Sequence, residues 1–255
     1  MNGGALKRTL AEGGTCVGAI VKIPSPDVVE VLCGSGLDFV IVDSEHGPSG
    51  PETCQQMVRA GEALGVPVFV RIGESGSPAT VTRFLDTGVS GVHLPHISSA
   101  ATAREQVRQL LHPPAGERGL AGGRWAGYGT KGPLPGQVDS VVDSLCVVAQ
   151  IEDAEAHEAL DEILAMGELD VFFLGSTDLA ASLGFRGDRD EPRVREMSEE
   201  ILRRTVEAGR TAGLLASTPE EAAWGLKLGA RYIVFNAESL IQWGAKRGLD
   251  AVAAQ

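Results

Sequence analysis

The sequence predicts a single α/β domain over residues 1–255, built as a (β/α)8 TIM barrel. Short apolar runs recur along the chain with helical segments between them. Most runs are near-continuous rather than alternating, which is typical of parallel strands covered on both faces. The length of 255 residues is that of one such barrel. A doubly wound sheet would alternate in the same way, but no G-x-G-x-x-G motif follows the first run.

Eight strands are expected in chain order. They cover residues 17–23, 39–43, 66–72, 91–97, 145–152, 171–175, 214–217 and 232–236. Several of the helices between them have recognisable starts, because Ser25–Pro26, Ser77–Pro78 and Thr218–Pro219 each pair an N-cap residue with a proline at the first helical position. Single glycines before strands, such as Gly65 and Gly229, suit the residue that follows a helix.

Composition and charge exclude several classes of protein. Hydrophobic residues make up 43% of the chain and charged residues 22%, as in a globular domain with a core. The net charge of −12 argues against nucleic acid and anionic membranes as partners. The four cysteines form no C-x-x-C pair, and scattered thiols suit a reducing compartment. With neither a signal peptide nor an apolar run of membrane-spanning length in the sequence, we expect a cytoplasmic protein.

One segment departs from the regular pattern. In residues 112–139, 12 of 28 positions are glycine or proline, too many for a core element. Loops of this length within a compact domain are usually functional or mobile. Because it carries Arg118, Arg124 and Tyr128, the segment is interpreted either as a lid over an anionic ligand or as a surface excursion that packs on a neighbouring subunit.

Polar side chains end several of the predicted strands. In a (β/α)8 enzyme the chemistry takes place at the carboxyl ends of the strands, so these residues are expected to meet. Gln150 and Glu152 end the fifth strand and point to the same side. Glu152 and Asp178 are one βα unit apart, and two such carboxylates suit Mg²⁺ or Mn²⁺. The alternative is a structural role as helix N-caps, which Asp178 in particular could fill.

Arg71 and His46 are the other candidates at the strand ends. Arg71 ends an apolar strand and therefore needs an anion, which is either Asp43 or Glu45 or the enolate or carboxylate of a substrate. His46 lies on a loop after an acidic strand end, where it could act as a general base with Asp86 as its partner. The alternative for His46 is a solvent-exposed loop histidine.

The fourth predicted strand carries two further histidines. His93 and His96 are three residues apart, so the strand period of two places them on opposite faces. On this reasoning they cannot both enter one site.

Several motifs occur together and in a fixed order along the chain. They are Asp43-Ser-Glu-His-Gly-Pro, Arg83-Phe-Leu-Asp-Thr-Gly, Gln150-Ile-Glu and Gly175-Ser-Thr-Asp-Leu. In these motifs, and over roughly residues 18–243, the sequence resembles the HpcH/HpaI aldolase family of metal-dependent class II pyruvate aldolases. The resemblance implies a barrel of the phosphoenolpyruvate/pyruvate-binding type. Its final helix would be exchanged with a neighbour, commonly in a hexamer built as a trimer of dimers.

The resemblance also implies roles for individual residues. Glu152 and Asp178 would hold a divalent cation, Mg²⁺, Mn²⁺ or Co²⁺. Arg71 would contact the keto oxygen of pyruvate, and His46 with Asp86 would take part in proton transfer. The pyruvate site would be lined by the remaining motif residues, with backbone amides near Thr177 and Asp178 receiving the carboxylate: Gln150, Gly175, Ser176, Thr177 and Asp178.

The reaction implied is an aldol cleavage or formation of 4-hydroxy-2-oxo acids. Pyruvate would be the enolate donor and an aldehyde the acceptor. An alternative is a lyase similar to the citrate lyase β subunit, acting on CoA thioesters, although no basic cluster is present to hold the CoA phosphates. Another alternative is a non-catalytic barrel that binds an oxo acid. The histidines at 93 and 96 stand where relatives usually carry apolar residues, so the aldehyde pocket is expected to differ.

Overall fold

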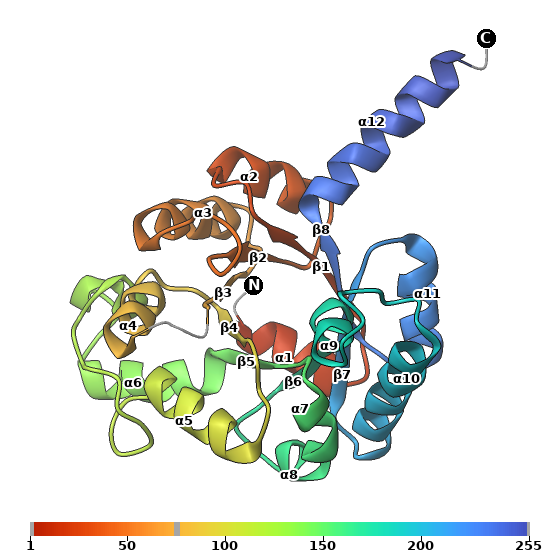
Figure 1. Cartoon of the computed structure of the whole chain (residues 1–255). Coiled ribbons are helices and arrows are strands. Elements are labelled where there is room, and N and C mark those ends of the chain that lie inside the picture. The colour runs from red at the N-terminus through yellow and green to blue at the C-terminus, as the bar shows by residue number, and fades with distance from the viewer. Residues whose placement is uncertain (1–2, 74–76, 254–255) are drawn as a thin grey trace.

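The computed structural model describes residues 3–73 and 77–253. Its eight strands pair in chain order, each parallel to the next, and β8 pairs with β1 to close a barrel (Figure 1). The predicted (β/α)8 barrel is confirmed. The strands are β1 Cys16–Val21, β2 Phe39–Asp43, β3 Val68–Arg71, β4 Gly91–Leu94, β5 Cys146–Ile151, β6 Val171–Leu174, β7 Thr211–Ala216 and β8 Tyr232–Asn236.

Helices cover the outside of the barrel, joined to the strands by short loops. Ser77 and Thr218 accept the backbone N–H groups of Thr80 and Glu221, as their N-cap positions predict, whereas Ser25 makes no such bond. The helices are α1 Gly3–Ala11, α2 Pro26–Gly34, α3 Pro51–Ala63, α4 Pro78–Asp86, α5 Ala100–Leu110, the 3-10 helix η1 Arg124–Gly129, α6 Leu134–Ser144, α7 Ala154–Glu158, α8 Leu160–Leu164, α9 Ser176–Ser182, α10 Pro192–Glu207, α11 Pro219–Lys227 and α12 Ala237–Ala253.

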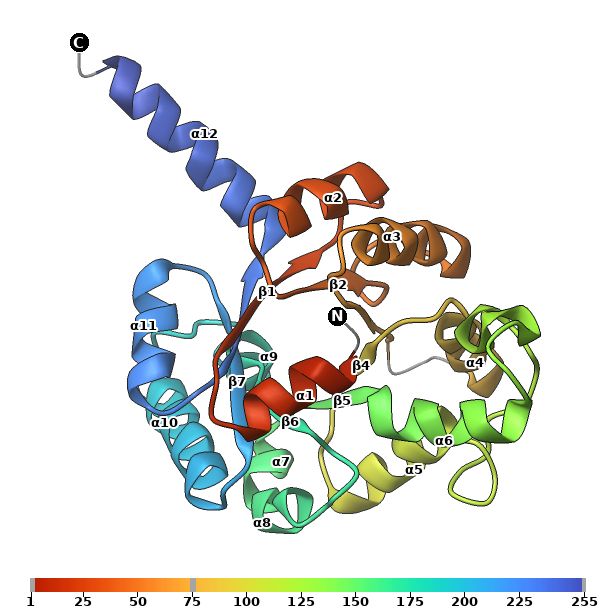
Figure 2. The same ribbon diagram turned by 180° about the vertical axis from the view of Figure 1, so that it is seen from behind.

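The interior of the barrel is a packed core rather than a channel. Phe39 stacks on Tyr232 with ring centroids 4.4 Å apart and on Phe69 at 5.5 Å. From the end where the strands begin, α1 inserts Leu6 and Leu10 into the same cluster, and it lies across this end in Figure 2. Among the residues that the structure describes, α1 closes this end, which leaves the opposite end, where the strands finish, for a ligand.

The segment 112–139 is ordered, and it packs at the end where the strands begin. The buried Arg118 donates to Asp86 at 2.8 Å, and Arg124 pairs with Glu62. Asp86 and Glu62 lie in the last turns of α4 and α3, which run back from the strand ends to the strand starts. Both arginines of the segment 112–139 therefore form ion pairs far from the strand ends. The lid interpretation is wrong within one chain.

The last helix, α12, extends away from the barrel (Figures 1 and 2). Ala237 at its start is buried, whereas Ile241, Leu249 and Val252 are 52%, 70% and 76% exposed. Exposed apolar side chains on a helix that leaves its own domain are typical of a surface that packs against another subunit. Among the described helices, none is both long and apolar enough to span a bilayer.

Candidate active site

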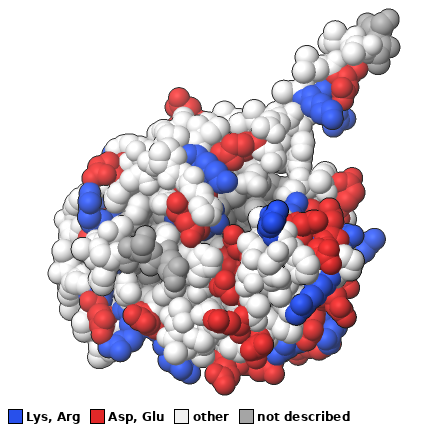
Figure 3. Space-filling view, in the orientation of Figure 1, with Lys and Arg blue, Asp and Glu red and all other residues white. Residues whose placement is uncertain are grey.

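The polar residues expected at the strand ends lie at the end of the barrel that faces the viewer in Figure 1. Asp43 and Arg71 are the last residues of β2 and β3, Glu152 directly follows β5, and Asp178 lies in the first turn of α9. Figure 3 shows acidic and basic side chains around a central hollow at this end. We call this group the rim, and it comprises Asp43, Glu45, His46, Arg71, His96, Gln150, Glu152 and Asp178.

Arg71 is held by two carboxylates. Its Nε and Nη2 donate to Oδ1 and Oδ2 of Asp43 at 3.1 and 2.7 Å, and Nε lies 3.2 Å from Oε2 of Glu45. Burial favours a higher pKa for Asp43, but the hydrogen bond and charge of Arg71 hold that pKa below its usual value. Both partners considered from the sequence are therefore present. Within the described part of the chain, Nη1 of Arg71 makes no hydrogen bond, so it is available to a ligand.

His46 lies on the loop after β2, with 55% of its side chain exposed. Its backbone N–H donates to Asp43 Oδ1 at 3.1 Å, which anchors the loop to the end of the strand. Its ring Nε2 is 3.8 Å from Oε2 of Glu45. Burial raises the pKa of Glu45, although the charge of Arg71 opposes this. The acidic neighbour of His46 in this chain is thus Glu45.

Asp86 does not meet His46. It ends α4 at the opposite end of the barrel, where it accepts a hydrogen bond from Arg118. The sequence did carry a signal for this, because Asp86 lies two residues before Gly88, at the end of a helix, and helices of a (β/α)8 barrel run back from the strand ends to the strand starts. The expected His46–Asp86 pair is wrong within a single chain.

Glu152 is 2% exposed and held from two sides. Its Oε1 accepts the backbone N–H of His96 at 2.8 Å, and its Oε2 accepts Nε2 of Gln150 at 2.8 Å. Burial raises the pKa of Glu152 to about 7, and the charge of Asp178 contributes in the same direction. A carboxyl group with this pKa is poised to exchange its proton for a cation.

Gly175 places α9 directly against this carboxylate. A Cβ added at Gly175 would lie 2.3 Å from Oε2 of Glu152, so only glycine fits here. The three residues that follow, Ser176, Thr177 and Asp178, form the first turn of α9 and leave backbone N–H groups free at its start. The structure therefore brings Gln150, Glu152, Gly175 and Asp178 together, as the sequence predicts.

His96 is a rim residue that sequence reasoning missed. Strand β4 ends at Leu94, so the period of two no longer applies two residues later, and His96 adopts a φ of 52°. Its ring Nδ1 lies 3.4 Å from Asp153 and 3.7 Å from Glu152. Burial opposes it, but the charges of these two carboxylates raise the pKa of His96 above its usual value. His93 points into the barrel interior below, so the two histidines do not enter one site, as expected, although the strand that motivated the expectation ends before His96.

The rim is suited to a divalent cation. Glu152 and Asp178 supply two carboxylates in one place, and their mutual repulsion is the condition that a cation relieves. Within residues 3–73 and 77–253, no cluster of three or more potential protein ligands is formed. A hard cation bound by two carboxylates would therefore take its other ligands from water and substrate, as is common for Mg²⁺.

Comparison with known proteins identifies the family. Residues 19–240 match the family model described as HpcH/HpaI aldolase/citrate lyase. The chain belongs to this family. The chain is 33% identical over 260 residues to a 4-hydroxy-2-oxovalerate aldolase of Novosphingobium aromaticivorans, covering 98% of this chain and 97% of that protein. It is 31% identical to a 2-keto-3-deoxy-L-rhamnonate aldolase of Escherichia coli (strain K12), over 92% of this chain and 87% of the relative.

A solved structure agrees with this assignment. The HpcH/HpaI aldolase from Desulfitobacterium hafniense DCB-2 superimposes with a TM-score of 0.86 and 31% identity, covering 97% of this chain and 96% of that one. The resemblance inferred from the motifs is confirmed. The family and its relatives support an aldolase, a carbon–carbon lyase, over a CoA-thioester lyase or a non-catalytic barrel.

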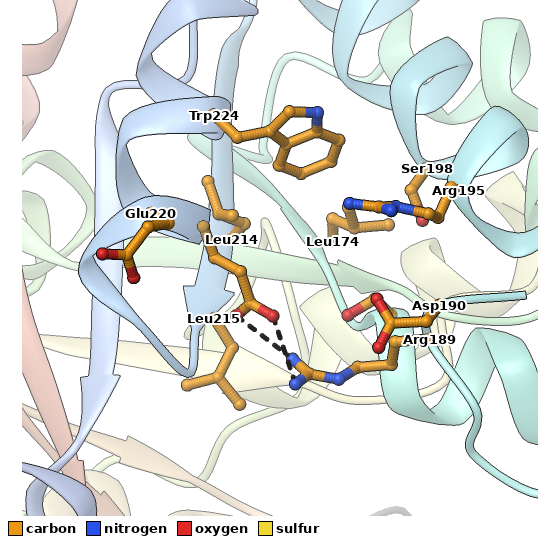
Figure 4. Close-up of a pocket in the computed structure, with 11 residues that line it drawn as sticks. Leu174, Arg189, Asp190, Arg195, Ser198, Leu214, Leu215, Glu220 and Trp224 are labelled. Atoms are coloured by element: carbon orange, nitrogen blue, oxygen red, sulfur yellow. Dashed lines mark hydrogen bonds and ion pairs between the residues drawn. The ribbon is translucent and has the colours of Figure 1, made fainter.

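Next to the rim of this family member, a cavity of about 170 Å³ opens behind the barrel wall (Figure 4). Leu174 and Leu214, which face the helices, line it together with Trp224 of α11. An ion pair between Arg189 and Glu221, at 3.2 Å, crosses its side. Of the residues that line the cavity, only Ser176 belongs to the predicted site.

Proposed function

We propose that this chain is a divalent-metal-dependent aldolase that cleaves or forms 4-hydroxy-2-oxo acids, with pyruvate as the enolate donor and an aldehyde as the acceptor. The observation that carries the proposal is the buried Glu152 carboxylate beside Asp178, on the same rim as Arg71. The names of the relatives, which act on 4-hydroxy-2-oxovalerate and 2-keto-3-deoxy-L-rhamnonate, support the class of substrate.

Glu152 and Asp178 would hold the cation, Mg²⁺, Mn²⁺ or Co²⁺. When bound, it would supply Lewis-acid stabilisation of negative charge on the keto oxygen of the substrate. The chain contributes a fixed geometry, because the His96 N–H and the Gln150 amide already hold the two oxygens of Glu152. Ordered ligands of this kind reduce the reorganisation that the reaction requires.

Arg71 stabilises the enolate. Asp43 and Glu45 fix its guanidinium plane, and the free Nη1 donates to the keto oxygen as negative charge develops there. The pyruvate carboxylate would accept backbone N–H groups at Gly175, Ser176, Thr177 and Asp178. Gln150 lines the same site.

His46 moves a proton. Its exposed ring, on the loop above Arg71, exchanges a proton with the 4-hydroxyl group of the aldol directly or through an ordered water. Because Asp86 lies at the other end of its own chain, a second subunit would have to supply it to His46. Mixing the two inactive variants His46→Ala and Asp86→Ala tests this: activity returns in mixed oligomers only if the two residues act across a subunit boundary.

The assembly is proposed to be a hexamer of the trimer-of-dimers type, with α12 exchanged between subunits. Leu249 and Val252, exposed on the protruding helix, would then be buried by a neighbour. We expect Leu249→Asp with Val252→Asp to lower the mass measured by sedimentation velocity, whereas Val31→Asp on exposed α2 leaves it unchanged. An unchanged mass for the double variant would contradict the exchange.

A cytoplasmic location is proposed from the thiols. Cys16, Cys33, Cys54 and Cys146 are all buried and all free. Burial raises the pKa of Cys16 and Cys33 to about 11 and that of Cys54 to about 12, so these thiols are unreactive structural residues that suit a reducing compartment.

The decisive experiment separates donor chemistry from acceptor choice. Protein stripped with EDTA is incubated with pyruvate in deuterium oxide, with and without added Mn²⁺, and methyl-proton exchange is followed by NMR. We expect exchange only with the metal, and carbon–carbon bond formation with a panel of aldehydes, read by mass spectrometry. Exchange that is unaffected by EDTA, or activity lost when borohydride is added with pyruvate, would contradict the proposal, because the latter indicates a Schiff base.

A further inference from the structure

Four polar side chains form a line through the interior of the barrel, which is otherwise apolar. Tyr232 lies at the start of β8, His93 on β4 and Gln150 on β5, and Glu152 stands at the rim. Their exposed fractions are 0%, 1%, 2% and 2%. Polar groups buried this deeply destabilise a core unless each finds a hydrogen-bond partner, so the line requires a physical reason.

The two ends of this line are closed by short hydrogen bonds. The Tyr232 hydroxyl is 2.8 Å from Nε2 of His93, and Nε2 of Gln150 is 2.8 Å from Oε2 of Glu152. In the middle, His93 Nδ1 and Gln150 Oε1 are both buried without a partner among the described residues. The Gln150 side chain nevertheless interacts with the His93 ring. A protonated Nδ1 of His93 can donate a hydrogen bond and Oε1 of Gln150 can accept one, so each atom can serve as the partner that the other lacks.

The direction of each hydrogen bond follows from the orientation of the Gln150 amide. Gln150 donates from Nε2 to Oε2 of Glu152 at 2.8 Å, so its Oε1, on the other side of the amide, is left to accept from His93. Burial, followed by the charge of Arg71, lowers the pKa of His93 to about 3, so the ring is neutral and carries one N–H. That proton must be on Nδ1 to meet Oε1 of Gln150, which leaves Nε2 to accept the Tyr232 hydroxyl.

We propose that Tyr232 and His93 are positioning residues that hold the Gln150 amide in the orientation that donates to Glu152, and so fix the Glu152 carboxylate. The inference rests on the proposed role of Glu152 as a metal ligand. Neither residue contacts the substrate. Without them the Gln150 amide can rotate, and its carbonyl oxygen would then face the carboxylate and repel it.

If these residues are linked in this way, a substitution at the Tyr232 end of the line should alter metal binding at the Glu152 end. Tyr232→Phe removes only a hydroxyl, far below the rim, yet it frees the His93 ring to adopt the other tautomer. We expect Mn²⁺ affinity to fall by about tenfold, the low end for residues that support a metal ligand through another group. Combining Tyr232→Phe with His93→Leu is expected to add little to either change alone, because the two residues act in series.

The test compares variants of equal size. His93→Asn retains a donor near the position of Nδ1, whereas the isosteric His93→Leu does not. Mn²⁺ affinity is measured by electron paramagnetic resonance on folded protein, and the His93 tautomer by 15N NMR, with the signal assigned from its absence in His93→Asn. Val234→Ala, which opens space in the same interior cluster, is the control for packing loss.

We expect wild-type His93 to carry its proton on Nδ1, Tyr232→Phe and His93→Leu to bind Mn²⁺ about tenfold more weakly, and His93→Asn and Val234→Ala to bind as wild type does. Glu152→Gln fixes the reference, because it should abolish binding. If Glu152→Gln abolishes binding but Tyr232→Phe and His93→Leu do not weaken it, or if the proton is on Nε2, this inference alone is overturned. Binding that survives Glu152→Gln overturns the proposed metal site and this inference with it.

Discussion

At the end of the barrel where the strands begin, two cations each meet a carboxylate of their own: Lys7 lies 3.0 Å from Asp170, and Arg118 donates to Asp86 at 2.8 Å. At the other end, Arg71 is shared by two carboxylates, while Glu152 lies near Asp178 and 3.7 Å from the His96 imidazole. Matched charges of the first kind serve to hold elements together. An excess of negative charge stabilises no fold by itself, and it is the reason for proposing that this end binds a cation.

The largest effect on turnover is expected from a substitution at the rim, whereas the matching substitution at the opposite end should leave turnover unchanged. Asp178→Asn should lower metal-dependent aldol turnover by at least about a hundredfold, because it removes a ligand rather than a supporting group. Its matched control is Asp170→Asn, where the carboxylate pairs with Lys7 and accepts the Val147 N–H. That variant should lose thermal stability but keep its turnover. Equal turnover in both variants would remove the distinction between the two ends.

Arg71→Lys tests whether the rim arginine acts through its shape. Lysine keeps the charge, but it cannot span Asp43 and Glu45 while pointing a further N–H at the keto oxygen. We expect deuterium exchange into pyruvate to slow by about a hundredfold, as for the loss of one oxyanion donor. Arg210→Lys is the control, because Arg210 donates to carbonyl groups near the strand starts. Normal exchange in Arg71→Lys would refute this role.

Arg118→Met tests the opposite end. The Arg118 side chain is 1% exposed, and its removal leaves Asp86 without its partner. Since the Asp86 side chain is 33% exposed, water reaches it, and the loss should be smaller than for a fully buried pair, about 2 kcal/mol of unfolding free energy. Urea unfolding measures this. A wild-type midpoint would show that the ordered segment 112–139 does not depend on the ion pair.

The last expected effect lies between the two ends, at His93, and it depends on pH. Its folded pKa of about 3 is below its unfolded value, so between these values the unfolded chain binds the extra proton. Stability should therefore be full above about pH 6.5 and fall by up to about 1.4 kcal/mol per pH unit as the pH is lowered toward 3. In His93→Leu, the contribution of this residue to the change of unfolding free energy with pH should disappear. An equal pH dependence in both proteins would contradict the buried neutral ring.

Much of the fold could be predicted because parallel strands are buried on both faces. Residues 39–43 and 232–236 coincide with β2 and β8, whereas 214–217 is shorter than β7, which begins at Thr211. Gly65 and Gly229 have φ values of 71° and 93°, as their place after helices predicts. Runs such as 91–97 were too long, because apolar character continues past the last hydrogen-bonded residue of β4.

The candidate site was predictable where it follows a strand, and not where it depends on a turn or a helix. Arg71, Gln150 and Glu152 are fixed by strand direction, so their meeting follows from the barrel alone. His96 reaches Glu152 through a left-handed backbone conformation that the letters Pro-His-Ile do not reveal. Asp86 was assigned to the wrong end because a helix carries its last turn away from the strand ends.

The sequence by itself determined the barrel, the family and the polar residues that end the strands, because burial on both faces and the order of short motifs are local properties. Only the tertiary structure decided which end each polar group occupies and which neighbour it meets. Tyr232 and His93 are 139 positions apart in the chain, yet their side chains are 2.8 Å apart. Such a meeting depends on closure of the sheet, which no local pattern encodes.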